Sequence, residues 1–127
     1  AAVSDFKPKE IYKNKIKKDE TEKHLNLKMD KNSDILKVIS EKNLNLKTVG
    51  FAAETENLLS NAKKKLSQKK LDLIVANDVS NKDIGFDSDE NEVTLITKKE
   101  QKKIKKASKK IVSKKIVEFI ASKVVND

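Results

Sequence analysis

The sequence predicts an α/β fold in which a mainly parallel sheet is covered by helices on both faces. Three observations support this prediction. A short β-type run at residues 48–51 stops before a helical pattern, and residues 71–76 form a nearly unbroken apolar run of strand length. Between them, at residues 55–69, apolar side chains recur at the helical period. This strand, helix, strand order produces a right-handed crossover, which makes the two strands parallel.

The amino-terminal segment predicts one partial strand, one loop and one complete strand. Residues 1–3 are small and apolar and predict the end of a buried strand, and residues 4–8 predict the loop that leaves it, with Pro8 as the breaker. Because a domain seldom starts inside a strand, we expect the chain to be a fragment whose domain begins upstream. After an irregular polar stretch, apolar and polar residues alternate over residues 25–29, which predicts a strand with one solvated face.

A short helix is predicted next, with residues 32–34 as its cap and an end near Asn43. Its apolar positions are Ile35, Leu36, Val38 and Ile39. The following strand is predicted at residues 46–51, because Thr48 and Val49 favour a pleated, buried backbone. Gly50 in this strand permits the close approach of backbone or ligand.

The helix over residues 55–69 is expected to be capped by Thr55. Its apolar positions are Leu58, Leu59, Ala62 and Leu66. The strand at residues 71–76 is expected to be central and parallel, and residues 80–92 predict a long, irregular loop.

The carboxyl-terminal part permits two interpretations. After a strand at residues 93–97, residues 102–106 form the second arm of a hairpin, or everything from Lys98 onward forms one long helix. We prefer the hairpin, because Ser108 is a good helix cap and an apolar stripe begins directly after it. The stripe consists of Val112, Ile116, Phe119, Ile120 and Val124.

Composition limits the class of protein. The 127 residues suffice for one domain or the larger part of one, and their apolar residues are clustered into runs although 39% of all residues are charged. No apolar run approaches the ~20 residues that a membrane helix needs. We therefore expect a soluble, cytoplasmic protein. Zero Cys and one His leave little basis for a disulfide framework, a thiolate metal site or a Ser/His relay.

The net charge of +9 comes from 29 basic residues, all of them Lys. Nucleic-acid readers rely on the Arg fork and on exposed aromatic rings, and aromatic residues make up only 4% of this chain. We therefore expect no nucleic-acid partner and no membrane partner. The competing interpretation, a Lys-rich and non-enzymatic module that binds polyanions or nucleic acid, stays open at this point.

Several residues are candidates for a binding site at the carboxyl ends of parallel strands, where open α/β sheets bind ligands. Phe51, expected just past a strand end, can stack on a planar ring, and the alternative is a core Phe. Lys65 and Lys69 lie four apart on one helix face and can clamp a polyphosphate, or they belong to a solvated face. Asn77 ends a buried strand and can point into the site.

Two further candidates lie near the amino terminus. Asp5 can accept hydrogen bonds from an amino group or a sugar hydroxyl, and the alternative is a turn-forming Asp beside Pro8. Lys15, in the run of residues 15–18, can stabilise a developing oxyanion, and the alternative is a plain surface run.

The order of these motifs closely resembles the carboxyl-terminal half of bacterial phosphopantothenate-cysteine ligase. The resemblance covers essentially the whole chain, 1–127, as the carboxyl-terminal portion of a single domain. It is carried by residues 1–6, 15–18, 31–35, 49–55, 76–79, 85–86 and 88–91. In this family the ligase is commonly the second half of a bifunctional coenzyme A biosynthesis protein, whose first half is an FMN-dependent decarboxylase.

The resemblance implies a Rossmann-like three-layer αβα domain, usually a homodimer. It implies that 4′-phosphopantothenate is activated with CTP and Mg²⁺ to an acyl-cytidylate, from which the amine of cysteine displaces CMP. The family's nucleotide-binding positions match Asp5, Lys15, Ser33, Asp34, Ile35, Phe51, Lys65 and Lys69. Lys15 would also stabilise charge on the activated carboxylate, and Asn77 remains a possible pocket residue. No metal ligand can be assigned.

The chain also departs from the family pattern. Ser33 stands where the family usually has Pro, and Phe6 replaces a larger or hydroxylated aromatic residue. Residues 17–24 match a flap that closes over the intermediate, slightly shortened here. The family's Gly-rich phosphate-binding turn and first strands precede Ala1, so the resemblance implies that this chain holds about half of the site.

Overall fold

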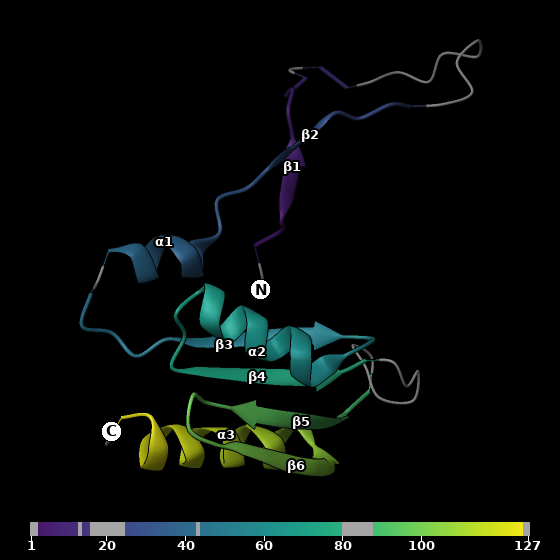
Figure 1. Ribbon diagram of the computed structural model, residues 1–127. Coiled ribbons are helices and arrows are strands. Elements are labelled where there is room, and N and C mark those ends of the chain that lie inside the picture. Colours follow the sequence, from purple (N-terminus) through teal and green to yellow (C-terminus); the bar gives the residue numbers. More distant parts are fainter. Residues whose placement is uncertain (1–2, 13, 16–24, 43, 80–87, 126–127) are drawn as a thin grey trace. The chain divides into compact units, whose positions relative to one another are not determined.

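The computed structural model describes residues 3–12, 14–15, 25–42, 44–79 and 88–125 (Figure 1). It confirms the α/β class, with three helices and two sheets in this part of the chain. The chain divides into two compact units, Ala1–Ile35 and Leu36–Asp127. The predicted flap at residues 17–24 and most of the predicted loop at residues 80–92 lie outside the described residues.

The first unit contains a two-stranded antiparallel sheet of β1 (Phe6–Pro8) and β2 (Met29–Lys31). Strand β1 lies where we expected a loop, and β2 begins at the last residue of the alternating segment. The prediction was wrong for β1 because its partner is more than 20 residues away, so no local pattern indicates the pairing. Pro8 is tolerated there because it is the last residue of a strand in a two-stranded sheet.

The predicted short helix is confirmed as α1 (Ile35–Glu41), which ends before the expected Asn43. Leu36 of this helix is the first residue of the second unit and packs against the core cluster that contains Ala62 and Leu66. Ile35 and Val38 are exposed.

The second unit is built on a four-stranded sheet in the order β3 (Val49–Glu54), β4 (Leu73–Asp78), β5 (Glu90–Ile96) and β6 (Gln101–Ser108). Only β3 and β4 are parallel, since β5 is antiparallel to both of its neighbours. The expectation of a mainly parallel sheet is therefore wrong for the described strands, and the sheet is mixed. The physical reason is that only β3 and β4 are joined through a crossover helix, whereas β5 and β6 are joined by a tight hairpin turn.

Helices cover both faces of this sheet, so the three-layer prediction is confirmed for the second unit. Helix α2 (Leu58–Gln68) packs on one face through Ala62 and Leu66. Helix α3 (Lys109–Lys123) packs on the other face, over β5 and β6 (Figure 1). Because side chains alternate along a strand, β4 contributes Leu73 and Val75 to the α3 side and Ile74 and Ala76 to the α2 side.

The hairpin interpretation of the carboxyl-terminal part is confirmed, and the single long helix is wrong. Ser108 caps α3 as predicted, because its Oγ accepts a 3.4 Å hydrogen bond from the backbone N of Ile111. The cap predicted for α2 is wrong. Strand β3 continues to Glu54, and Asn57, with φ of 50°, starts the helix without a side-chain cap bond. Leu59 is exposed and therefore not a core position.

Candidate functional site

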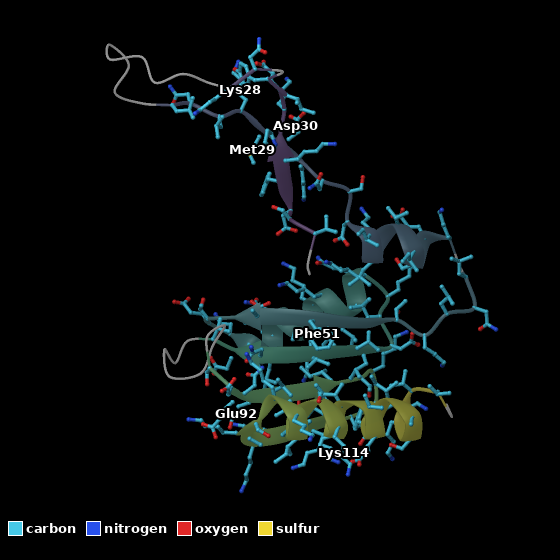
Figure 2. All side chains as sticks on the ribbon, turned by 180° about the vertical axis from the view of Figure 1, so that it is seen from behind. Lys28, Met29, Asp30, Phe51, Glu92 and Lys114 are labelled. Carbon is cyan, nitrogen blue, oxygen red and sulfur yellow. The ribbon has the colours of Figure 1, made fainter. Side chains whose placement is uncertain are left out.

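Phe51 lies in the middle of β3, opposite Val75 of β4, and not past the strand end as predicted. Its side chain is 73% exposed, so the alternative of a core Phe is also wrong. Strand β3 is an outer strand of the sheet (Figure 2). Phe51 is on the same side as Val49, which packs on the α3-side core, but α3 itself lies over β5 and β6. The ring is therefore left uncovered on an open part of the sheet.

Asn77 lies on the same face of the sheet as Phe51. Ala53 pairs with Asn77 in the register that pairs Phe51 with Val75, so the two side chains are two residues apart along neighbouring parallel strands. The Oδ1 atom of Asn77 is buried and has no hydrogen-bond partner among the residues that the structure describes. A buried acceptor of this kind is costly when it is unpaired. The structure thus puts an exposed aromatic ring in the middle of β3 on the same face of the sheet as an unsatisfied amide near the carboxyl end of β4.

Lys65 belongs to the opposite face of the sheet. Its Nζ donates a 2.6 Å hydrogen bond to Oε1 of Glu54, the last residue of β3. The Nδ2 of Asn61 donates to the other carboxylate oxygen at 3.2 Å. The hydrogen bond from Lys65 is the main reason why the pKa of Glu54 lies below its ordinary value of 4.5, since partial burial acts in the other direction.

Lys69 is half-buried and forms the C-cap of α2, where its backbone N donates to the carbonyl of Lys65. Lys65 and Lys69 are predicted to share one helix face, and the structure has Lys65 in the last turn of α2 and Lys69 at its C-cap. The sheet nevertheless separates α2 from the face that carries Phe51 and Asn77. Lys65 is 44% exposed and lies beside Glu54, the last residue of β3.

We expected Gly50 to permit the close approach of backbone or ligand, and in the structure it is two side chains that approach it. A Cβ atom at this position would lie 2.6 Å from Cδ1 of Leu71 and 3.5 Å from Cδ1 of Leu36. Gly50 is buried, and both neighbours belong to the core on the α2 side. The missing side chain therefore makes room for two leucines.

In the first unit, Asp5 is next to the segment that contains Ser33, Asp34 and Ile35. The backbone N of Asn32 donates to the carbonyl of Asp5 at 2.8 Å, and its Nδ2 donates to the carbonyl of Ser4 at 2.7 Å. Asp34 is half-buried, whereas Asp5 and its other neighbours in this group are exposed. Two sequence-predicted segments that are 28 residues apart are thus held side by side.

Lys15 is exposed, and the flap expected after it lies outside the described residues. Among the residues that the structure describes, no three His, Asp or Glu side chains gather into a metal-binding group. No helix of this part of the chain is long and apolar enough to cross a membrane.

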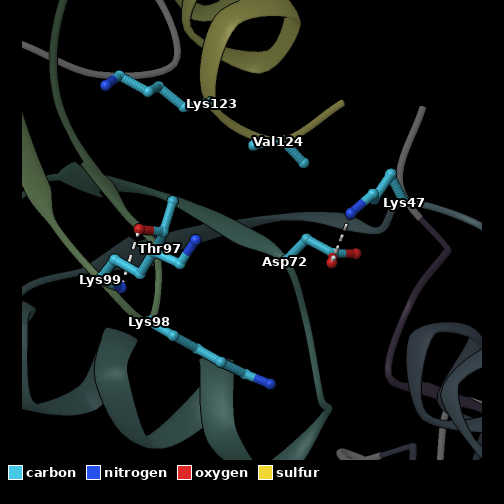
Figure 3. A pocket seen from close by; sticks show the side chains of 7 residues that line it. All are labelled: Lys47, Asp72, Thr97, Lys98, Lys99, Lys123 and Val124. Atoms are coloured by element: carbon cyan, nitrogen blue, oxygen red, sulfur yellow. Dashed lines mark hydrogen bonds and ion pairs between the residues drawn. The ribbon is translucent and has the colours of Figure 1, made fainter. Parts of the chain in front are cut away.

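A separate hollow of about 170 Å³ lies away from Phe51, at the amino ends of β3 and β4 (Figure 3). It is lined by Lys47, Asp72, Thr97, Lys98, Lys99, Lys123 and Val124. Two hydrogen bonds hold Asp72 in place there. Its Oδ2 accepts them from the backbone N of Thr48 at 2.7 Å and from Thr48 Oγ1 at 3.2 Å. The contact fastens the start of β3 to the start of β4.

Sequence reasoning missed Glu54, Asn61 and Asp72. Glu54 ends a strand and is followed by Asn61 and Lys65 on one helix face, and this spacing was the signal that could have revealed the cluster. Asp72 begins an apolar run, and nothing local connects it with Thr48.

An α/β fold with an exposed ring and a buried polar group on one face of two neighbouring parallel strands defines a protein with a candidate small-molecule site. The chain belongs to the DNA/pantothenate metabolism flavoprotein C-terminal domain family, which matches residues 1–124.

Curated relatives of this chain share one name, Coenzyme A biosynthesis bifunctional protein CoaBC. The protein from Bacillus subtilis is 45% identical over 123 residues, covering 96% of this chain and 30% of its own length. That from Escherichia coli is 38% identical over 125 residues, covering 97% and 31%. The chain thus spans about a third of these relatives.

Solved structures agree with the fold. The crystal structure of the C-terminal domain of a CoaBC protein has a TM-score of 0.73 and 30% identity, covering all of this chain and 53% of that one. The DNA/pantothenate metabolism flavoprotein from Streptococcus pneumoniae, at 21% identity, has a TM-score of 0.63 over 81% of this chain and 44% of that one.

Proposed function

We propose that this chain is part of a phosphopantothenate-cysteine ligase that acts in coenzyme A biosynthesis in the cytoplasm. The names of the relatives support the pathway. The proposed chemistry rests on Phe51, whose aromatic ring is 73% exposed in the middle of β3. Asn77, whose Oδ1 has no partner among the described residues, lies on the same face of the neighbouring strand β4. An exposed ring in such a place suits the stacking of a nucleotide base.

In the proposed reaction, CTP reacts with the carboxylate of 4′-phosphopantothenate to give an acyl-cytidylate and pyrophosphate. The amine of cysteine then attacks the acyl carbon, an amide bond forms, and CMP leaves. The chain's own contribution is binding, orientation and charge stabilisation. Stacking on Phe51 is worth about 1–3 kcal/mol by analogy with single-stranded nucleic acids.

The cationic roles in this proposal belong to Lys15, Lys65 and Lys69. Lys15 neutralises charge on the activated carboxylate. Lys65 keeps two ammonium protons beyond the one that it gives to Glu54, so it can contact a phosphate without leaving its partner. Asp5, Ser33, Asp34 and Ile35 of the first unit are proposed as further nucleotide-binding residues on the family resemblance alone.

Magnesium enters the proposal as the partner of the triphosphate. The described residues offer no cage of three carboxylates or imidazoles, and this fits the usual behaviour of Mg²⁺, which keeps several waters and binds through substrate phosphates with one or two carboxylates. Its charge would neutralise the phosphates during attack. No residue of this chain is assigned to it.

We also propose that the protein forms a homodimer through the first unit. The described residues of this unit expose a series of large apolar side chains, which a second copy would cover. They are Phe6, Ile11, Tyr12, Leu25, Leu27 and Met29. Replacing both Leu27 and Met29 by Asp should convert a dimer into a monomer in light scattering, and a mass unchanged by the two charges contradicts this interface.

The proposed nucleotide site is tested by isothermal titration of CTP against the native full-length protein. Phe51→Ala should weaken CTP binding about tenfold, the equivalent of roughly 1.4 kcal/mol. Val117→Ala, another exposed apolar side chain but on α3, is the matched control and should leave the affinity unchanged. Equal affinities for wild type and Phe51→Ala would remove the ring from the site.

A further inference from the structure

The excess positive charge of the chain is concentrated in one region. Residues 98–125 contain eleven Lys and two Glu, a net charge of +9, whereas all other residues together contain 18 Lys and 18 Asp or Glu. A general bias toward Lys would spread the excess over the chain. Here the region that forms β6 and α3 carries all of it, and the remainder is balanced.

Few of these lysines are neutralised by neighbours. Lys103 pairs with Glu92 at 2.7 Å, Lys106 with Glu90 at 3.2 Å and Lys123 with Glu100 at 3.7 Å. Seven exposed lysines of the region have no ion pair with any described residue. They are Lys98, Lys102, Lys105, Lys109, Lys110, Lys114 and Lys115. Figure 2 shows Lys114 on α3.

The free lysines of both elements line a common hollow. Lys102 and Lys105 of β6 and Lys115 of α3 line a cavity of about 440 Å³. Its lining also contains Lys103, Lys123, Glu100, Glu118, Ser122 and the apolar residues Ile104 and Phe119. Ile104 and Phe119 are buried core residues, so the backbone that carries these lysines is held firmly. Five lysines against two glutamates leave the lining with an excess of positive charge, which favours an anion.

We propose that this β6–α3 surface, residues 98–125, binds inorganic polyphosphate through the ammonium groups of its lysines. A base-reading partner is disfavoured because the region has no Arg, and Phe119, its one aromatic residue, is buried. A flexible chain of phosphates needs neither stacking nor a fork-shaped donor. It needs closely spaced cations along a surface, which β6 and α3 supply.

The proposed polyphosphate surface is separate from the candidate nucleotide site. Strands β3 and β6 form opposite edges of the four-stranded sheet, and Phe51 belongs to β3. The surface therefore does not depend on the ligase proposal, and CTP binding serves as an internal control for folding.

The test is a salt titration of fluorescent polyphosphate binding to the native full-length protein. One variant combines Lys102→Gln, Lys105→Gln and Lys115→Gln. The matched control combines Lys28→Gln, Lys31→Gln and Lys64→Gln, three exposed lysines of the balanced part without a described ion pair. We expect the first variant to bind at least tenfold more weakly and to reduce the slope of log affinity against log salt by roughly 2, since each lost phosphate contact contributes about 0.7.

The control should bind like wild type, and a variant with Arg at the three β6–α3 positions should retain affinity. If both Gln triples weakened polyphosphate binding equally, polyphosphate would be attracted by the net charge of the whole protein, and the proposed β6–α3 surface would be wrong. Loss of binding in the Arg triple would overturn recognition by charge. An oligouridylate with the same number of phosphates that binds as tightly as polyphosphate would overturn the choice of partner.

Discussion

Lys65 of α2 donates a 2.6 Å hydrogen bond to Glu54, the last residue of β3. The carboxylate is 11% exposed and also accepts from Asn61, so one strand end is fastened to two successive turns of the helix that follows it. The same lysine is proposed to contact a nucleotide phosphate. The structural role of Lys65, as the partner of Glu54, is tested on its own by replacing Glu54.

Glu54→Gln should lower the free energy of unfolding by about 1 kcal/mol at pH 7, because it removes the charged partner of Lys65 from a partly buried pair. The pKa of Glu54 is lowered in the folded state, so its contribution is fully present above the ordinary value of 4.5 and is lost as the pH falls through the folded-state pKa. Urea unfolding at a series of pH values measures both effects.

The two proteins should converge in stability in acid, once the pH has fallen below the lowered folded-state pKa of Glu54. Glu56→Gln is the control, because Glu56 is exposed and its side chain has no described ion pair. A stability gap between wild type and Glu54→Gln that is constant from pH 7 to pH 3 contradicts the assignment.

Ser108→Ala should destabilise the second unit by about 1 kcal/mol, because the backbone N of Ile111 loses its acceptor at the start of α3. Ser113→Ala is the control within the same helix. Its Oγ donates only to the carbonyl of Lys110, so the change should cost less than about 0.5 kcal/mol. Thermal unfolding compares them, and equal losses would show that Ser108 is not a functional cap.

The features that the sequence predicts correctly are local patterns. The cap at Ser108 and the stripe that begins at Val112 are local patterns, and the structure confirms both. The apolar run of β4 is also a local pattern, because a strand that is covered on both faces consists of consecutive apolar residues. The α2 boundary was misplaced because β3 continues through Ala53 to Glu54 by pairing with β4, which overrides the preference of Thr55 for a cap.

What the sequence could not reveal are relations between distant residues. The antiparallel partners of β4 and the pairing of β1 with β2 depend on contacts that no local pattern records. Phe51 was correctly chosen as a candidate but placed past a strand end, and its exposure follows from α3 covering β5 and β6 instead of β3. The roles of Lys15 and of the nucleotide partners rest on the resemblance and stay predictions.

Asp72→Ala should destabilise the second unit by about 1–3 kcal/mol, because the backbone N of Thr48 is left without its acceptor at the start of β3. Asp72→Asn retains a side-chain oxygen and should cost less. Thr48→Val removes only the hydroxyl contact at 3.2 Å and should be the mildest change. Chemical unfolding gives this order, and an Ala variant as stable as wild type contradicts it.

Phe51→Ala should separate binding from stability. A side chain that is 73% exposed contributes little to the core, so the melting temperature should change by less than about 2 °C while CTP affinity falls. Phe119→Ala is the opposite case, because that ring of α3 is buried in the core between the helix and the sheet and its loss should cost about 3–5 kcal/mol. Parallel loss of stability and affinity in Phe51→Ala would show that the ring is structural.

The most direct measurement is the formation of 4′-phosphopantothenoylcysteine by the native full-length protein, with CTP or ATP, in wild type and Lys15→Ala. The proposal predicts product and CMP with CTP, little product with ATP, and at least a hundredfold lower turnover in Lys15→Ala, as is typical when a group that stabilises developing charge is removed. Lys9→Ala, an exposed lysine of the same unit, should remain active. Absence of product with CTP in wild type, or undiminished turnover in Lys15→Ala, would contradict it.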